Sequence, residues 1–398
     1  MRIALFRSYT ICIPLVVLLS VAASAQNAAA QKPSQEGAPP ADNSDAQFQK
    51  LEQRLSSVRE RNAKQYAIDT AKGIDEAMYV PIGGIDQWVT IRGQDRHNPV
   101  LLFLHGGPGD VTNPWSFPYF AAWEERFVVV QWDERGSGRT LGKTGRSTAP
   151  TITRERMAQD GIELSEFLRK HLGVDKIILV SHSFGTILAL RMARARPDLF
   201  YAYVGTGQVA DETRNYSVAY TALLEKALAI GNQEALAELR RIGPPPYADG
   251  QGYRVQWKWA NRFEGADRFL AATLGLALTS PGYSIRDLND AMDGESLSAE
   301  QLVGTTKPAT IKDLGLDLGV PVFFFQGTED FTTPTALARQ YLEALKAPVK
   351  AFVPIEGGHF AVFMNSDQFL KELVIRVLPL ANYSRQAHAN SASENARR

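Results

Sequence analysis

Residues 176–186 read KIILVSHSFGT, and this stretch decides the fold of the chain. An apolar run leads through Ser181 to Ser183 and Gly185, and a helical pattern then continues to Arg196. A serine between small residues at a strand-to-helix turn is the nucleophile-elbow pattern, because small flanks let the strand and the helix pack closely. We therefore predict that Ser183 projects its hydroxyl from the carboxyl end of a buried strand. A serine that only caps a helix would look similar.

Apolar runs alternate with helical patterns on both sides of this stretch. Continuous apolar runs of four to six residues fit strands that are buried on both faces of a parallel sheet, and they occupy residues 100–104, 127–130, 176–180 and 320–325. The helical patterns that separate them cover residues 154–171, 186–196, 334–345 and 368–377. This alternation predicts an α/β protein with a mostly parallel, doubly wound sheet. A leading hairpin is expected around Gly83-Gly84.

The domain boundaries follow from changes in this pattern. Residues 210–305 break the alternation and are mostly helical in character, so we expect a helical cap insertion there. The core then consists of two parts, residues 47–209 and 306–383. Residues 26–46 are rich in Ala, Gln, Pro and Ser and read as a flexible linker, and the polar residues 384–398 read as a disordered tail.

The first 25 residues have the pattern of a signal peptide. Arg2 and Arg7 precede an apolar run over residues 11–22, and small residues at 23–25 occupy the positions that a signal peptidase reads. The apolar run is shorter than the ~20 residues needed to span a bilayer. We expect cleavage after Ala25 and a periplasmic or extracellular product without membrane attachment. The single cysteine, Cys12, would be removed with the signal.

Composition excludes several classes of protein. Lys and Arg number 43, as do Asp and Glu, so the formal net charge is zero and a nucleic-acid partner is not expected. One cysteine in 398 residues excludes a disulfide framework and a cysteine-based zinc site. No motif calls for a metal or a cofactor, and none is expected. The expected partner is a small molecule or a short peptide, as substrate. The oligomeric state stays open.

The order of residues along the chain selects a general base and an acid for Ser183. In elbow hydrolases the acid and then the histidine follow the serine. His97, His105, His171 and His182 precede Ser183, and His388 lies in the polar tail. That leaves His359, in a glycine-rich loop after a short apolar run. Asp330, after the apolar run 320–325, is the preferred acid, with Glu329 as the fallback.

A glycine-rich loop supplies the fourth element of the predicted site. The residues HGGPG at 105–109 come directly after the apolar run 100–104. Glycines let backbone N–H groups approach a substrate carbonyl closely, so the N–H groups of Gly107 and Phe184 are expected to bind the developing oxyanion.

These motifs together resemble the proline iminopeptidase family of α/β-hydrolases. The resemblance rests on HGGPG at 105–109, WDERGSGR at 132–139 and the elbow, and it covers roughly residues 78–208 and 318–379. It implies the α/β-hydrolase fold, a cap over the site, and removal of an amino-terminal residue, typically proline, from peptides. It also implies the triad Ser183, Asp330 and His359, and a role for residues 133 and 135 in stabilising the loop under the site.

Two departures from the family pattern affect specificity more than the hydrolase chemistry. Ser181 and Phe184 stand where the family has Gly and Trp. The cap also lacks the family's Trp-x-x-Trp-Glu segment, whose carboxylate binds the substrate ammonium. Residues 257–264 (WKWANRFE) contain two tryptophans and a glutamate but at a different spacing. Trp257, Trp259 and Glu264 are therefore candidate substrate-binding residues, although an exposed helical glutamate is the preferred interpretation of Glu264.

Three functions stay open on the sequence. The first is an exopeptidase that acts on small peptides with a free amino terminus. The second is a carboxylester hydrolase that uses the same triad. The third is a non-catalytic binding protein that kept the fold, since fold does not imply function.

Overall fold

The computed structural model describes residues 43–247, 250–303 and 306–382. The predicted signal peptide over residues 1–25 and the predicted tail over residues 384–398 lie outside these residues. Helix α2 begins at Asn43, so the last residues of the segment expected to be a linker, 26–46, are helical. Within the described ranges, no helix is both long and apolar enough to cross a membrane.

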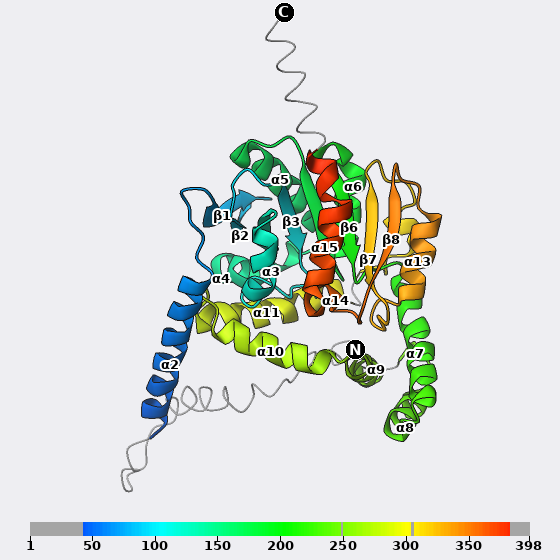
Figure 1. The fold of residues 1–398 in the computed structure, drawn as a ribbon. Coiled ribbons are helices and arrows are strands. Elements are labelled where there is room, and N and C mark those ends of the chain that lie inside the picture. Colours follow the sequence, from blue (N-terminus) through cyan, green and yellow to red (C-terminus); the bar gives the residue numbers. More distant parts are fainter. Residues whose placement is uncertain (1–42, 248–249, 304–305, 383–398) are drawn as a thin grey trace, which may run out of the picture.

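One eight-stranded sheet, in the order β1-β2-β4-β3-β5-β6-β7-β8, forms the centre of the described chain (Figure 1). Strands β3 to β8 run parallel to one another. Strands β1 and β2 form an antiparallel hairpin, and β2 pairs antiparallel with β4. The strands are β1 (Ile74–Ile82), β2 (Ile85–Gly93), β3 (Val100–Leu104), β4 (Val128–Asp133), β5 (Ile177–His182), β6 (Phe200–Thr206), β7 (Val322–Gly327) and β8 (Lys350–Ile355). The predicted α/β class and its mostly parallel sheet are confirmed.

The central strands are buried on both faces. Every residue of β3 to β7 is buried, which is why these strands appear in the sequence as continuous apolar runs and not as alternating ones. Between β1 and β2, Gly83 and Gly84 have φ of +56° and +77°. Two residues with positive φ suit the tight turn of a hairpin whose strands twist in the right-handed sense.

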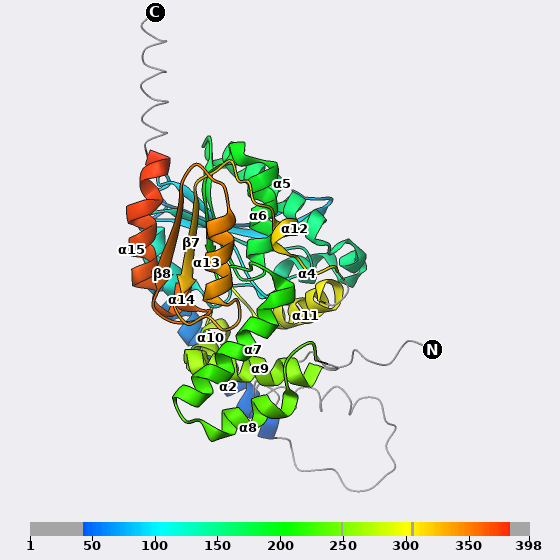
Figure 2. The same ribbon diagram turned by 90° about the vertical axis from the view of Figure 1, so that its right-hand side faces the viewer.

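Helices cover both faces of the sheet (Figure 2). Alternate strand residues divide between two apolar clusters, one for each face. One cluster includes α5 (Arg154–Leu172), α6 (Gly185–Ala195) and α13 (Thr335–Ala344). The other includes α3 (Phe117–Glu124), α14 (Ala361–Met364) and α15 (Ser366–Arg376). The remaining helical elements outside the insertion are α2 (Asn43–Gln65), α4 (Gly138–Thr144), η2 (Arg146–Thr151), η3 (Pro197–Leu199) and α12 (Ile311–Leu314).

Six helices of the described ranges lie between β6 and β7, and we call the first five of them the helical insertion. They are α7 (Glu212–Ala229), α8 (Gln233–Ile242), α9 (Gly250–Glu264), α10 (Ala266–Leu278) and α11 (Ile285–Leu302). The insertion lies across the end of the sheet at which the parallel strands finish (Figure 1). It has a small apolar cluster of its own, centred on Tyr220, Leu223 and Trp259. Side-chain caps at Asp211 and Ser284 begin α7 and α11.

Candidate active site

Ser183 occupies a sharp turn between β5 and α6. Its φ of +52° is the only positive value among the described residues other than glycine, as expected of a strained elbow. The peptide N–H of Ser183 donates to the Thr206 carbonyl at 3.0 Å, which ties the turn to β6. A side chain on Gly185 would overlap the His105 carbonyl, so the helix can begin here only with glycine. The sequence therefore places the Ser183 hydroxyl as predicted, at the carboxyl end of a central strand.

Three side chains from the ends of β5, β7 and β8 form a chain of hydrogen bonds. The Ser183 hydroxyl lies 3.0 Å from Nε2 of His359. Nδ1 of His359 lies 3.0 Å from Oδ2 and 3.3 Å from Oδ1 of Asp330. His359 and Asp330 are both buried. The structure thus brings together the three residues that the sequence selected, in the order hydroxyl, imidazole and carboxylate.

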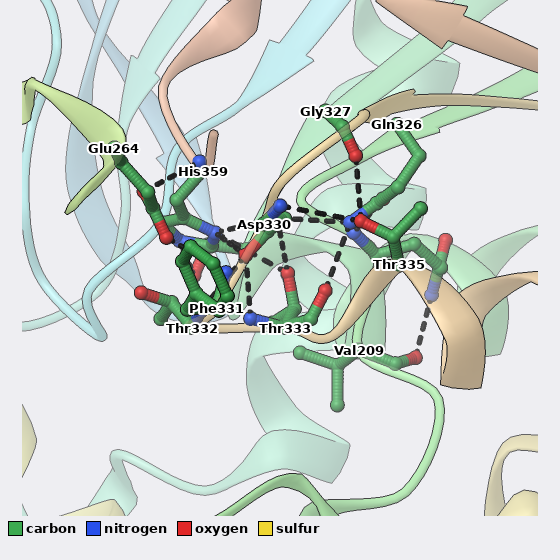
Figure 3. Close-up of polar contacts among 12 residues, drawn as sticks. Val209, Glu264, Gln326, Gly327, Asp330, Phe331, Thr332, Thr333, Thr335 and His359 are labelled. Atoms are coloured by element: carbon green, nitrogen blue, oxygen red, sulfur yellow. Dashed lines mark hydrogen bonds and ion pairs between the residues drawn. The ribbon is translucent and has the colours of Figure 1, made fainter. Parts of the chain in front are cut away.

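Asp330 is held rigidly by the loop that follows β7 (Figure 3). Oδ1 accepts from the N–H groups of Thr332 at 2.9 Å and Thr333 at 2.7 Å. Oδ2 accepts from the Thr333 hydroxyl and from Nε2 of Gln326, both at 2.8 Å. These donors satisfy the carboxylate and fix its orientation toward the imidazole. Because four donors hold the Asp330 carboxylate in place, it can fix the orientation of the His359 imidazole.

Glu329, the fallback acid, has a different environment. Its side chain is half exposed and forms an ion pair with Nζ of Lys226 at 2.6 Å. Its peptide N–H donates to the Gly357 carbonyl, so the backbone at Glu329 helps to join the loops that follow β7 and β8. The structure places the Asp330 carboxylate, and not that of Glu329, against His359.

Electrostatics make His359 a stronger base than a free imidazole. Burial alone lowers the pKa of His359, but the charge and hydrogen bond of Asp330, together with the charge of Glu264, outweigh it and raise the pKa above its ordinary value. The neighbouring ring of His182 lies 4.7 Å away between centroids. Burial and the charge of His359 hold the pKa of His182 well below its ordinary value, so His182 stays neutral beside it.

The two expected oxyanion donors flank the elbow. Phe184 is the N-cap residue of α6, and Gly107 has a φ of +108° in the loop after β3. Neither N–H group donates to another residue of the described ranges. Gly106 lies directly against Ser183, because a Cβ on Gly106 would be 2.9 Å from the serine Cβ. The loop is shaped by the buried His105, whose Nδ1 lies 3.0 Å from the Gly106 carbonyl.

Glu264 is buried, so its interpretation as an exposed helical glutamate is wrong. Only 9% of it is exposed, and its two oxygens accept from the backbone N–H groups of Phe331 and His359, both at 2.7 Å. Burial, and then the charge of Asp330, raise the pKa of Glu264 to about 7. No sequence pattern predicts this environment, because both donors come from loops far along the chain.

The two tryptophans proposed as substrate contacts do not join this cluster. Trp259 is 1% exposed, and its indole donates to Glu238 at 2.9 Å inside the insertion. Trp257 is 39% exposed on the surface of α9. Helix α9 directs Trp259 into the apolar cluster of the insertion and Trp257 to solvent. In the described structure neither of these two substrate-binding candidates lies beside Ser183.

Two carboxylates near the glycine-rich loop were missed by the sequence reasoning. Asp110 directly follows HGGPG, and its N–H donates to the Gly106 carbonyl at 3.3 Å. Gly109 packs on α11, where a Cβ would lie 2.8 Å from the Gly294 carbonyl, and this brings Asp110 toward Glu295. Asp110 is exposed in this loop, and local desolvation of its carboxyl together with the charge of Glu295 holds its pKa above the ordinary value. Burial raises the pKa of Glu295. The sequence feature that could have pointed to this pair is the acidic residue directly after HGGPG.

The Asp-x-Arg turn lies beneath the site. Asp133 accepts from Nδ2 of Asn113 at 2.7 Å and from the N–H of Arg139 at 3.0 Å. Arg135 is buried and pairs with both oxygens of Asp160, at 2.7 and 3.1 Å. Neither residue contacts Ser183, Asp330 or His359, so their contacts support the turn. Across the described ranges, no group of His, Cys, Asp and Glu is arranged to hold a metal ion.

Comparisons with known proteins agree with this geometry. A family model described as "Alpha/beta hydrolase family" matches residues 101–372. The chain is 31% identical over 295 residues to "Probable aminopeptidase YbaC" of Bacillus subtilis (strain 168), across 73% of this chain and 92% of that protein. It is 34% identical over 164 residues to a "Probable proline iminopeptidase" of Streptomyces coelicolor, across 39% of this chain and 45% of that protein.

Solved structures share the fold. The structure of VinJ matches with a TM-score of 0.54 at 20% identity, over 77% of this chain and 99% of that one. At this level of identity the likeness concerns the fold and not the substrate.

Proposed function

Because this chain belongs to the alpha/beta hydrolase family, we propose that it is a serine hydrolase that releases the amino-terminal residue from small peptides. The observation that carries the proposal is the chain of hydrogen bonds from Ser183 through His359 to Asp330. The aminopeptidase and proline iminopeptidase names of the relatives support the peptide substrate.

The proposed reaction divides into acylation and hydrolysis. Nε2 of His359 takes the proton of the Ser183 hydroxyl while the serine oxygen attacks the scissile carbonyl. The N–H groups of Gly107 and Phe184 stabilise the resulting oxyanion. His359 then gives its proton to the leaving amine, and the acyl group remains on Ser183. In the second half a water gives a proton to His359 while its oxygen attacks the acyl carbonyl. His359 then returns that proton to the departing Ser183 oxygen, and the free acid is released.

Labelling with a fluorophosphonate tests the nucleophile. Ser183→Ala is expected to abolish both labelling and turnover while the thermal unfolding midpoint stays near that of the wild type. Ser165→Ala is a matched control, because it removes a buried hydroxyl that bonds only to the Gly161 carbonyl in α5. Full labelling of Ser183→Ala would overturn the proposal, and an unlabelled wild type would favour the binding-protein alternative.

Peptide and ester substrates are each favoured by one observation. Asp110 and Glu295 place two carboxylates near the glycine-rich loop, with no hydrogen bond or ion pair to another residue of the described ranges, and this favours a substrate that carries an ammonium group. The carboxylester hydrolase remains the second candidate, because Glu264, the acid expected to bind an ammonium, already accepts two backbone hydrogen bonds.

A substrate panel separates these two functions. Aminoacyl arylamides, prolyl arylamide among them, are expected to be cleaved faster than their N-acetylated forms. Asp110→Asn and Glu295→Gln are expected to raise KM for the free-amine substrates and to leave short-chain esters unaffected. Equal rates for free and blocked amines would support the esterase instead.

We also propose that the protein is exported through a signal peptide cleaved after Ala25. The charged, apolar and small-residue segments at residues 2–25 support this. Amino-terminal sequencing of the protein purified from its native host should begin at Gln26, and the activity should appear in the periplasmic or extracellular fraction. A cytoplasmic protein that retains Met1 would contradict the proposal.

A further inference from the structure

The last residue of α9 joins the helical insertion to two catalytic loops. Oε1 of Glu264 accepts from the N–H of Phe331, the residue after Asp330. Oε2 of Glu264 accepts from the N–H of His359 itself. One carboxylate therefore spans the loop after β7 and the loop after β8, as Figure 3 shows. The mechanism above gives this group no part in bond making or breaking.

The structure makes room for this carboxylate at a specific position. A Cβ on Gly358 would overlap Cγ, Cδ and Oε2 of Glu264, so only glycine before His359 permits the contact. Gly265, with a φ of +68°, ends the helix directly after Glu264 and lets the chain turn into α10. The backbone at Gly358 and at Gly265 thus accommodates the buried side chain of Glu264.

We propose that Glu264 is a positioning residue, which holds the acid loop and the base loop in register so that His359 stays between Asp330 and Ser183. This inference rests on the proposed serine hydrolase mechanism. Two charge-assisted hydrogen bonds fix the backbone on which the imidazole is mounted. The competence of the site then depends on docking of the insertion, because the acceptor belongs to α9 and the donors belong to the core.

A positioning role and an ammonium-binding role differ in what they change. An ammonium ligand acts on the binding of substrates with a free amine, and its loss raises KM for those substrates alone. A misplaced base slows the acylation of every substrate, and its loss lowers kcat for amides and esters alike. Whether a Glu264 variant changes KM for free-amine substrates or kcat for all substrates therefore identifies the role of Glu264.

The charge of Glu264 provides a second signature. The titratable groups that face it are Asp330 and His359, and the His182 ring lies beyond His359. The negative charge of Glu264 contributes to the raised pKa of His359. Replacing it with a neutral amide should therefore lower the pKa of His359 and move the acid limb of kcat/KM to lower pH. Glu238→Gln, whose carboxylate bonds to Lys258 and Trp259, should leave that limb in place.

Glu264→Gln is the direct test, and Glu238→Gln is the matched control. Glutamine has the same size but would present an amide N–H group to one of the two backbone donors. We expect kcat to fall by about 10- to 100-fold for both an aminoacyl arylamide and a short-chain ester, with KM nearly unchanged. Fluorophosphonate labelling of Ser183 should slow by a similar factor. Glu238 lies in the same insertion, and among the described residues its carboxylate bonds to Lys258 and Trp259 and not to the loops after β7 and β8, so its variant should keep wild-type kcat.

Hydrogen exchange tests the two contacts even if the variant folds poorly. In the wild type, peptides that include the amides of Phe331 and His359 should exchange slowly. They should exchange faster in Glu264→Asp, whose shorter side chain cannot reach both donors, and not in Glu238→Gln. Rapid exchange of both amides in the wild type would overturn the inference.

The remaining outcomes separate this inference from the proposed function. If the wild type is not labelled at Ser183, the serine hydrolase proposal fails and this inference fails with it. If the wild type is labelled and Glu264→Gln reacts equally fast, only the positioning role is wrong. If Glu264→Gln raises KM for free-amine substrates alone, Glu264 is an ammonium ligand and the positioning role is likewise overturned.

Discussion

At the residue scale, two adjacent carboxylates at the end of β7 have opposite surroundings. Asp330 is buried among four hydrogen-bond donors, whereas Glu329 is half exposed and paired with Lys226. Given the elbow at Ser183, sequence order left His359 as the base but left these two acids as alternatives. Their difference depends on which side of the loop faces β8, and no local pattern reports that.

The two acids should respond very differently to neutralisation. Asp330→Asn is expected to lower kcat by roughly 10⁴-fold, because the amide would no longer fix the tautomer and orientation of His359. Glu329→Gln, the neighbouring control, should lose only a weak surface ion pair and keep its kcat. The measurement is the steady-state rate on one substrate for both variants. A heavy loss in Glu329→Gln with a small loss in Asp330→Asn would reverse the assignment.

The pH profile should report the base directly. In the proposed mechanism the working form of His359 is the neutral imidazole, and Asp330 and Glu264 raise its pKa above the ordinary 6.5. Activity should therefore be complete above that raised pKa and fall as the pH drops through it, with the midpoint of kcat/KM above 6.5. An acid limb centred well below this value would show that the base is not His359 in its described environment.

Glu264 shows where residue-level prediction from sequence ends. Its two hydrogen-bond donors lie 67 and 95 positions further along the chain. A helical glutamate is normally exposed, and that expectation was wrong here because two loops fold over the end of α9. Only the fold brings these partners together.

At the element scale, the strands were predictable because burial on both faces leaves continuous apolar runs. The elbow and the HGGPG loop were predictable because tight turns and close approaches demand glycine and small residues. The turn after β4 was also visible as a motif, but its partners were not. Arg135 reaches across to α5, where Asp160 lies 25 positions away, and it also donates to the Gly83 carbonyl at 2.8 Å.

Loss of Arg135 should destabilise the whole core. Arg135→Ala would leave the Asp160 carboxylate buried with only the Arg156 guanidinium for a charge partner, and we expect the free energy of unfolding to fall by about 3–5 kcal/mol. Arg196→Ala is the control, because its ion pairs with Glu166 and Asp198 are exposed, and its loss should cost less than about 1 kcal/mol. Urea unfolding of both variants makes the comparison, and equal midpoints would contradict it.

At the scale of the whole molecule, the sequence predicted that a helical segment interrupts the sheet but not how that segment is anchored. The contacts that hold the helical insertion on the rest of the molecule come from several separate elements. Glu264 ties it to the loops after β7 and β8, and Gly109 in the glycine-rich loop packs on α11. Helix α2 anchors its other side, since Nε of Arg59 donates to the Leu278 carbonyl at 3.0 Å and Nδ2 of Asn62 to the Thr279 carbonyl at 2.8 Å.

Helix α2 should therefore contribute to stability through the insertion. Its two side chains satisfy carbonyl groups at the end of α10 that have no partner within the helix. Replacing both Arg59 and Asn62 with Ala should remove about 0.5–1.5 kcal/mol for each bond and lower the thermal midpoint by a few degrees. Ser57→Ala, whose hydroxyl bonds only to the nearby Arg54 carbonyl, should leave the midpoint unchanged. Identical midpoints for all three proteins would show that α2 is not an anchor.

The separation of 176 positions between Ser183 and His359 has a consequence for biosynthesis. A ribosome releases the strands from β1 to β8 in order, so a nascent chain contains its serine long before the strand that delivers the histidine. Until β8 joins the edge of the sheet, that serine is an ordinary alcohol without a base to activate it. In the proposed mechanism the serine therefore becomes reactive only after the strand that delivers His359 has been made and has paired with β7, and a fragment that ends before β8 carries no activated nucleophile.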